Sequence, residues 1–206
     1  DFTLFDNKAH ILIAIEKGQV KLPFVQKSRT DGYDGRGVQV VNTHADLELL
    51  IDAPCLVEEL VQLREEIAVI AARNEQGEVV CYDPVAMEFV EGANMLDLLL
   101  YPYNPGKALH DEAQKIASKL IQEFNICGLL AVEFFIDRNG RLLINEVAPR
   151  PHNSGHQTIE SSITSQYEQH LRAILNLPLG STDVIISSAM VNLLGAEGYS
   201  GQVHYE

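Results

Sequence analysis

The sequence contains few cysteines, and they are scattered. Cys55, Cys81 and Cys127 stand singly, and no Cys-x-x-Cys pair occurs. An odd, unclustered count argues against a disulfide framework and against a zinc knuckle. Isolated thiols are typical of proteins from a reducing compartment, so we expect a cytoplasmic protein.

Basic residues are also in short supply. The chain carries 15 Lys and Arg against 29 Asp and Glu, which gives a formal net charge of -14 at pH 7. Proteins that bind nucleic acid through its phosphate backbone are basic, so this balance argues against a nucleic-acid partner. Any anion that binds here must be held by local donors against a repulsive overall field.

Long apolar runs and targeting segments are missing as well. No stretch is long enough to span a bilayer and none has the layout of a signal peptide, so we expect no membrane partner. With 206 residues, 46% of them hydrophobic, the chain can build a sizeable core in one or two domains. It opens at Asp1 without a methionine, and residues 203–206 still read as a strand. We therefore expect a fragment of a longer protein.

Hydrophobic periodicity divides the chain into two units of an α+β fold. The first, residues 1–60, is a small module with a helix capped by Asp6. Its expected elements are helices at 6–17 and 44–52 and strands at 23–27, 38–42 and 55–60. The second, residues 61–206, has longer, antiparallel strands. Its expected elements are strands at 66–73, 79–91, 129–136 and 141–147, helices at 110–124 and 159–175, and a loop at 92–105.

Two acidic residues occupy otherwise apolar strands on either side of a turn. Asn139-Gly140 is a strong hairpin signal, and if these two residues form the loop, Glu133 faces Glu146. Directly opposed residues share a face of the sheet, with Cβ atoms about 5 Å apart. Two carboxylates so placed need a shared proton or, better at neutral pH, a divalent cation such as Mg²⁺. The alternative is that one glutamate lies at an exposed edge and pairs with an arginine.

The strand that carries Glu146 runs into a loop rich in polar groups. Residues 145–156 read Asn-Glu-Val-Ala-Pro-Arg-Pro-His-Asn-Ser-Gly-His. Arg150 suits a bidentate grip on a carboxylate or phosphate, and His152 with Asn153 can orient a small oxyanion. The spacing of the two histidines suits zinc only on a helix, which the prolines oppose. Because such loops position ligands more often than they pack, we interpret this one as the floor of an active site for phosphates and a small carboxylate.

A glycine-rich loop lies between the strands expected at 23–27 and 38–42. Its central residues are Gly32, Tyr33, Asp34 and Gly35. The loop matches neither a P-loop nor a dinucleotide fingerprint. It can fold over phosphates as a lid, with Lys27 upstream as a point charge. Taken alone, the glycines are more typical of an ordinary flexible hairpin.

An acidic stretch joins the two units. Glu58 and Glu59 lie within residues 56–61, and Glu66 follows on the next strand. Clefts between domains are common ligand sites, so backbone groups here can hold an adenine, with Glu66 accepting from ribose hydroxyls. The alternative is a solvated cluster of charges.

Taken together, these segments resemble the ATP-grasp superfamily, and within it the branch that carboxylates 5-aminoimidazole ribonucleotide in purine biosynthesis. The similarity covers nearly the whole chain, and the run at 145–156 is its most specific part. The resemblance implies an ATP-grasp fold, with a small lid subdomain over residues 1–60 and a larger antiparallel-sheet subdomain over residues 61–206. It also implies that the family's leading α/β domain is absent from this chain.

The resemblance further implies a reaction, a set of ligands and a homodimer. ATP would phosphorylate bicarbonate to carboxyphosphate, and the amine of 5-aminoimidazole ribonucleotide would take up the carboxyl group. The implied residues are Lys27, Gly32, Tyr33, Asp34, Gly35, Glu58, Glu59 and Glu66 for ATP, Glu133 and Glu146 for Mg²⁺, and Arg150, His152 and Asn153 for catalysis.

Two other functions stay open on the sequence alone. Another ATP-grasp ligase would share the nucleotide site and differ at the acceptor site. A non-catalytic nucleotide-binding regulatory module would keep Lys27 and the acidic hinge but would not need His152 with Asn153. The presence of that pair favours an enzyme.

Overall fold

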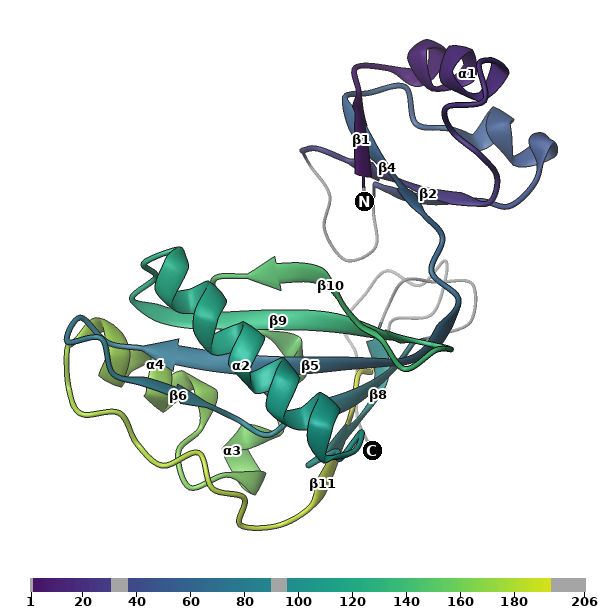
Figure 1. Ribbon diagram of the computed structural model, residues 1–206. Helices are drawn as coiled ribbons and strands as arrows, with labels where there is room; N and C mark the ends of the chain where they lie inside the picture. The colour runs from purple at the N-terminus through teal and green to yellow at the C-terminus, as the bar shows by residue number, and fades with distance from the viewer. Residues whose placement is uncertain (1, 31–36, 90–95, 194–206) are drawn as a thin grey trace, which may run out of the picture. The chain divides into compact units, whose positions relative to one another are not determined.

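The computed structural model describes residues 2–30, 37–89 and 96–193, and the chain divides into two compact units. The first holds Asp1–Arg64 and the tip of a hairpin, Phe135–Arg141. The second holds Glu65–Glu88, Leu96–Phe134 and the chain from Leu142 onward. Each unit is built around its own sheet (Figure 1).

The first unit is a four-stranded antiparallel sheet with two short helices, in the order β1-β4-β2-β3. Its elements are β1 Phe2–Phe5, α1 Lys8–Glu16, β2 Phe24–Ser28, β3 Val38–Val41, the 3-10 helix η1 His44–Leu49 and β4 Cys55–Glu59. Alternate residues of β4, Cys55 and Val57, are buried, as expected where one face of a sheet covers a core. They pack with Ile11 of α1 and Phe24 of β2.

Three details of this unit differ from the sequence-based expectation. Asn7 rather than Asp6 caps α1, because the Asn7 side chain accepts a hydrogen bond from the backbone N–H of His10 at 3.0 Å. The helix expected at 44–52 is a shorter 3-10 helix. Strand β1 is not predicted by the sequence pattern, since its partner β4 lies far along the chain.

The second unit is a seven-stranded sheet in the order β10-β9-β5-β7-β8-β11, with β6 paired to β5. Helix α2 lies on one face, and α3 and α4 lie on the other (Figure 1). The strands are β5 Leu63–Arg73, β6 Val79–Cys81, β7 Val85–Phe89, β8 Leu96–Tyr101, β9 Gly128–Asp137, β10 Leu142–Ala148 and β11 Ser188–Val191. The helices are α2 Lys107–Glu123, the 3-10 turn η2 Asn153–Gly155, α3 Thr158–Ser161 and α4 Gln166–Ile174.

Strand β5 shows why both faces of this sheet need cover. Its residues 67–72 are all buried, so side chains pointing to either face are removed from water. Ala113, Ala117 and Ile121 of α2 are fully buried, as the apolar stripe of this helix predicts.

The strands expected at 129–136 and 141–147 are confirmed as β9 and β10, but three other predictions in this unit are wrong in part. The strand expected at 79–91 is interrupted at Tyr82, whose hydroxyl donates to the Thr164 carbonyl. The loop expected at 92–105 contains β8. The helix expected at 159–175 is broken into α3 and α4.

The break between α3 and α4 has a local and a distant cause. Ser165 caps α4 by accepting from the backbone N–H of Glu168 at 3.2 Å. The intervening segment pairs with a remote one, since the N–H of Ile163 donates to the carbonyl of Asp183 at 3.0 Å. These contacts take up backbone groups that one continuous helix would use internally.

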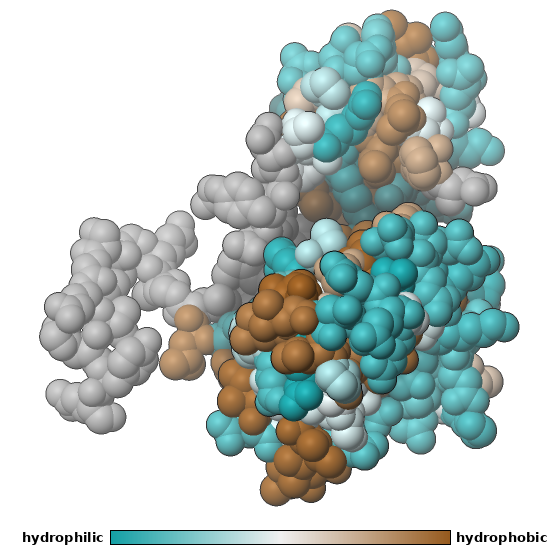
Figure 2. Space-filling model, turned by 90° about the vertical axis from the view of Figure 1, so that its left-hand side faces the viewer, coloured by the Kyte–Doolittle hydropathy of each residue, from teal (hydrophilic) through white to brown (hydrophobic). Residues whose placement is uncertain are grey.

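Apolar side chains also reach the surface of the second unit (Figure 2). Its exposed large hydrophobic residues include Ile159, Ile163, Ile185 and Ile186. None of the helices in the described ranges combines the length and the apolarity needed to cross a bilayer. Residues 203–206, which read as a strand in the sequence, lie outside the described residues.

Candidate active site

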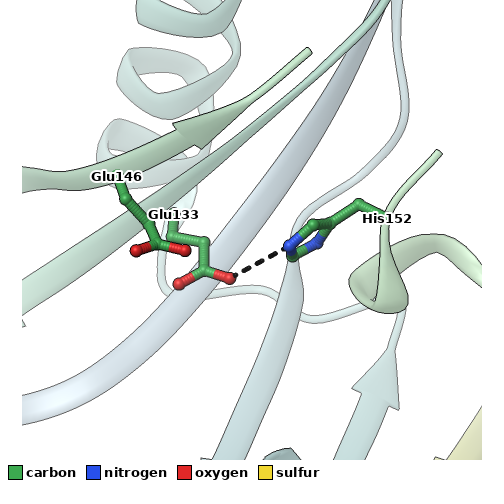
Figure 3. A group of neighbouring side chains, drawn as sticks. All are labelled: Glu133, Glu146 and His152. Atoms are coloured by element: carbon green, nitrogen blue, oxygen red, sulfur yellow. Dashed lines mark ion pairs between the residues drawn. The ribbon is translucent and has the colours of Figure 1, made fainter. Parts of the chain in front are cut away.

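Three side chains of the second unit converge. Glu133 of β9 and Glu146 of β10 point to the same place from neighbouring strands, and His152 meets them from the loop that follows β10 (Figure 3). One ligand atom from each lies within 4.8 Å of the others. The proximity of the two carboxylates that the hairpin predicts is confirmed, and their role as metal ligands stays a prediction.

The turn that joins β9 to β10 is longer than the expected two-residue loop. Asp137 N–H donates to the Arg141 carbonyl at 3.1 Å, and Gly140 N–H donates to the Asp137 carbonyl at 2.9 Å, so residues 138–140 form the loop. Gly140 has φ +78°, a conformation that favours glycine. The two glutamates converge, but the turn is one residue longer than the one from which the sequence argument sets them directly opposite each other.

The Asp137 carboxylate holds this turn in shape. It accepts hydrogen bonds from Asn139 N–H at 2.8 Å, from Arg141 N–H at 2.9 Å and from Arg141 Nε at 2.7 Å. These bonds, the one from the Arg141 backbone foremost, lower the pKa of Asp137 and keep its side chain ionised. One part of the alternative is confirmed, because Glu146 is exposed on β10, an edge strand of the sheet. Arg141 of the hairpin pairs with Asp137.

His152 is neutral near pH 7. Burial, and then the charges of Arg150 and His156, lower the pKa of His152 to about 4. Its Nδ1 lies 2.9 Å from Ser154 Oγ and accepts from the Ser154 backbone N–H at 3.3 Å. A backbone N–H can only donate, so the ring proton is on Nε2, which lies 3.5 Å from Glu133 Oε1. His152 therefore turns an N–H donor toward the carboxylates.

The loop around His152 leaves no room for a side chain at Gly155. A Cβ there would lie 2.3 Å from Ile70 Cδ1 and 2.6 Å from Gln166 Oε1. The Thr158 hydroxyl donates to the Gly155 carbonyl and secures the same turn. Close packing on β5 thus fixes the course of the chain that carries the histidine.

Arg150 and Asn153, the other two predicted catalytic residues, flank His152. Arg150 is exposed, and its Nη1 donates to the Pro151 carbonyl at 3.1 Å. The Oδ1 atom of Asn153 is buried, and within the described part of the chain it has no hydrogen-bond partner. A buried acceptor without a donor costs free energy unless a ligand or water supplies one.

The predicted nucleotide residues are distributed over both units. In the first unit, Lys27 Nζ on β2 lies 3.0 Å from Glu58 Oε2 on β4, and Glu59 is exposed. In the second, Glu66 pairs with Met87 in the ladder between β5 and β7. The glycine-loop residues Gly32, Tyr33, Asp34 and Gly35 lie outside the described residues.

The sequence reasoning assigned no role to Ser154 or Gln166, although both contact His152. Ser154 stands close enough in sequence for a local side-chain contact to be suspected. Nothing in the hydrophobic pattern points from Gln166 back to His152.

Comparisons with known proteins agree with this architecture. A family model described as the ATP-grasp domain matches residues 1–167. The N5-carboxyaminoimidazole ribonucleotide synthase of Bacillus subtilis is 43% identical over 183 residues, which cover 87% of this chain and 48% of that protein. The chain thus spans about half the length of this relative.

Solved structures that resemble this chain include enzymes whose names closely match that of this relative. The N5-carboxyaminoimidazole ribonucleotide synthetase of Thermotoga maritima is 40% identical, with a TM-score of 0.83 over 97% of this chain and 50% of that one. An Aspergillus clavatus N5-carboxyaminoimidazole synthase, solved with ADP and 5-aminoimidazole ribonucleotide, is 30% identical. Its TM-score is 0.83, and the match covers 96% of this chain and 52% of that one. Since the family model extends through both units and the site loop, the chain belongs to the ATP-grasp family.

Proposed function

We propose that this chain is the ATP-grasp part of an enzyme that uses ATP and bicarbonate to carboxylate the amino group of 5-aminoimidazole ribonucleotide. The observation that carries the proposal is the convergence of Glu133, Glu146 and His152 within 4.8 Å. The relatives that share 40% identity or more with this chain and bear the synthase name support the same substrate. The proposal includes a cytoplasmic homodimer.

The two carboxylates fit a magnesium ion. Their oxygen atoms point to the same place (Figure 3), and Mg²⁺ prefers oxygen ligands, taking one or two carboxylates together with substrate phosphates. When bound, Mg²⁺ neutralises charge on the phosphate oxygens of ATP. Glu133 and Glu146 are the residues assigned to hold it.

The loop after β10 is assigned to the anionic substrate. The Arg150 guanidinium can bind a carboxylate or phosphate through two parallel hydrogen bonds. His152 offers its Nε2–H, and as a neutral ring whose Nδ1 accepts from Ser154 it serves as a donor and not as a base. Asn153, whose Oδ1 is buried without a donor, can accept from an N–H or O–H group of a substrate.

The nucleotide is assigned to Lys27, the glycine loop, the hinge residues and Glu66. Lys27 is a point charge for a phosphate, and its ion pair with Glu58 holds the ammonium group in place on β2. Carboxyphosphate reacts with water, so the reaction requires that water be excluded while the carboxyl group is transferred. The glycine loop is assigned the role of lid.

Phosphate release by the whole protein tests this function. With Mg·ATP present, we expect release to depend on both bicarbonate and 5-aminoimidazole ribonucleotide and to match the N5-carboxylated product in amount. ATP hydrolysis that stays at background when both are added would contradict the proposal. Release that requires a different amine would point to another ATP-grasp ligase.

A further inference from the structure

A buried amide holds the loop that carries the two histidines. Gln166 is the first residue of α4, and its side chain is fully buried. Its Oε1 accepts from the backbone N–H of His152 at 2.9 Å, and its Nε2 donates to the carbonyl of the same residue at 2.8 Å. The reverse orientation of the amide would set donor against donor and acceptor against acceptor, so this orientation is fixed.

The fixed amide also determines where the proton of His156 lies. The Gln166 Nε2 atom is 3.0 Å from His156 Nδ1. An amide nitrogen donates only, so His156 Nδ1 is the acceptor, and a neutral imidazole must then carry its proton on Nε2. Burial lowers the pKa of His156, which keeps the ring neutral near pH 7.

Tyr167 contacts the same nitrogen of His156. Its hydroxyl lies 2.6 Å from His156 Nδ1, and the two rings stack with centroids 5.8 Å apart at 14°. Since the amide already requires an unprotonated Nδ1, the hydroxyl also donates. The ring of His156 is thus held by stacking and by two donors that share the single lone pair of Nδ1.

We infer that Gln166 is a positioning residue that aligns the His152 backbone and fixes His156 as the Nε2–H tautomer. His156 then carries its proton on the nitrogen that faces away from Gln166, where it can donate to a substrate oxyanion. The identity of that oxyanion, a carboxylate or phosphate group, rests on the proposed function. The tautomer itself does not depend on it.

Nitrogen NMR of the imidazole rings tests the tautomer directly. We expect long-range ¹H–¹⁵N spectra of the whole protein, labelled at histidine, to show His156 protonated on Nε2 at pH 7.5. The His156→Gln variant assigns the signal by its disappearance. In Gln166→Glu an acceptor replaces the donor, so the proton should appear on Nδ1 of His156. A wild-type spectrum with the proton on Nδ1 overturns the inference, even if Gln166→Glu does not fold.

Gln169 provides a matched control. It is fully buried one turn further along α4, and it holds the backbone of Gly180 in the same way, accepting from N–H and donating to C=O at 2.8 Å each. Among the described residues, the side-chain hydrogen bonds of Gln169 go to Gly180 and not to His152 or His156. Gln169→Glu should therefore leave the His156 spectrum unchanged. An equal change of the His156 spectrum in both variants would show that either substitution disturbs the packing around α4 as a whole, and it would overturn the positioning role of Gln166.

Two further measurements distinguish the positioning role of Gln166 from a role of Tyr167 and from the proposed function. Tyr167→Phe should keep the Nε2–H tautomer, because Gln166 alone suffices; a shift to Nδ1 there would assign the role to Tyr167 instead. Gln166→Glu should lower kcat for carboxylation about tenfold or more, since the loop loses its alignment. If the wild type carboxylates nothing but shows the expected tautomer, the proposed function fails and the positioning role holds.

Discussion

The Oε1 atom of Glu133 lies 3.5 Å from Nε2 of His152. Because the ring is neutral and its proton is on Nε2, this contact joins a carboxylate to a hydrogen-bond donor and not to a cation. Glu146 adds a second carboxylate within 4.8 Å, so the group as a whole is an acidic cluster beside one neutral donor. An arriving divalent cation would relieve the repulsion between the two carboxylates.

Replacing Glu146 should therefore remove metal-dependent nucleotide binding. We expect Glu146→Gln to lose Mg·ATP affinity at least about tenfold while the fold survives, because the residue is exposed and its shape is kept. Calorimetric titration with Mg·ATP measures the change. Glu123→Gln, an exposed site at the end of α2, serves as the control and should bind like the wild type. Equal affinities in all three proteins would remove the metal role from Glu146.

Lys27 should contribute to the binding of ATP phosphates. We expect Lys27→Met to weaken ATP binding about tenfold, since a hydrogen bond from a charged group is worth about 1.5 to 3 kcal/mol. Fluorescence competition with a labelled nucleotide gives the dissociation constant. The exposed Lys21→Met variant removes one positive charge from the same unit and should bind normally. A similar loss of ATP affinity in both variants would show that net charge, and not the position of Lys27, causes the effect.

Gly155→Ala should destabilise the second unit. The added Cβ would lie 2.3 Å from Ile70 Cδ1 and 2.6 Å from Gln166 Oε1, so these two buried side chains must shift, and we expect a loss of about 1 to 3 kcal/mol in the free energy of unfolding. Urea titration followed by circular dichroism measures it. At Gly77 a Cβ meets nothing within 4 Å and only the φ of +86° is unfavourable, so Gly77→Ala should cost about 1 kcal/mol. A smaller loss at Gly155 than at Gly77 would mean that the loop moves aside without strain.

His152 should make stability depend on pH below neutrality. Its pKa is lowered from 6.5 to about 4. Between these two pH values the imidazole is therefore protonated in the unfolded chain and neutral in the folded protein. Stability should fall as the pH drops from 6.5 toward 4 and level off below, by about 3 kcal/mol in all at about 1.4 kcal/mol per pKa unit. The difference between the unfolding midpoints at pH 7 and pH 5 measures how strongly stability depends on pH.

His152→Asn provides the comparison for this pH effect. Asparagine does not titrate, and its Oδ1 can replace Nδ1 as the acceptor from Ser154. The variant should lose less stability between pH 7 and pH 5 than the wild type. An equal loss of stability in the two proteins would contradict the buried, neutral state of His152.

The sequence predicts the parts of the site that depend on local patterns. Glu133 and Glu146 stand in apolar strands around a turn, and hairpin geometry alone indicates that they meet. The length of the turn is not predicted, because the Asp137 carboxylate binds the N–H groups of Asn139 and Arg141 and favours a three-residue loop. A loop longer by one residue shifts the pairing in which Glu133 would stand directly opposite Glu146, so the simple hairpin argument does not by itself account for their convergence.

Elements defined by distant partners are harder to predict. Residues 159–175 keep a helical spacing of apolar residues, yet backbone pairing of Ile163 with Asp183 breaks the helix. Strand β8 lies in an expected loop because its partners include β11, whose residues Ser188–Val191 follow much later. The contact of Gln166 with His152 is of the same kind, since hydrophobic periodicity carries no information about a buried amide.

The neutral rings of the 145–156 loop have one more consequence, for ionic strength. Arg150 is the only Lys or Arg in this stretch, so an incoming anion meets a single full positive charge there, together with oriented N–H dipoles. Added salt screens interactions between exposed charges far more than short hydrogen bonds in a buried place. An anion on this loop should therefore be selected by the direction of its lone pairs, and added salt should weaken its binding only through the exposed Arg150.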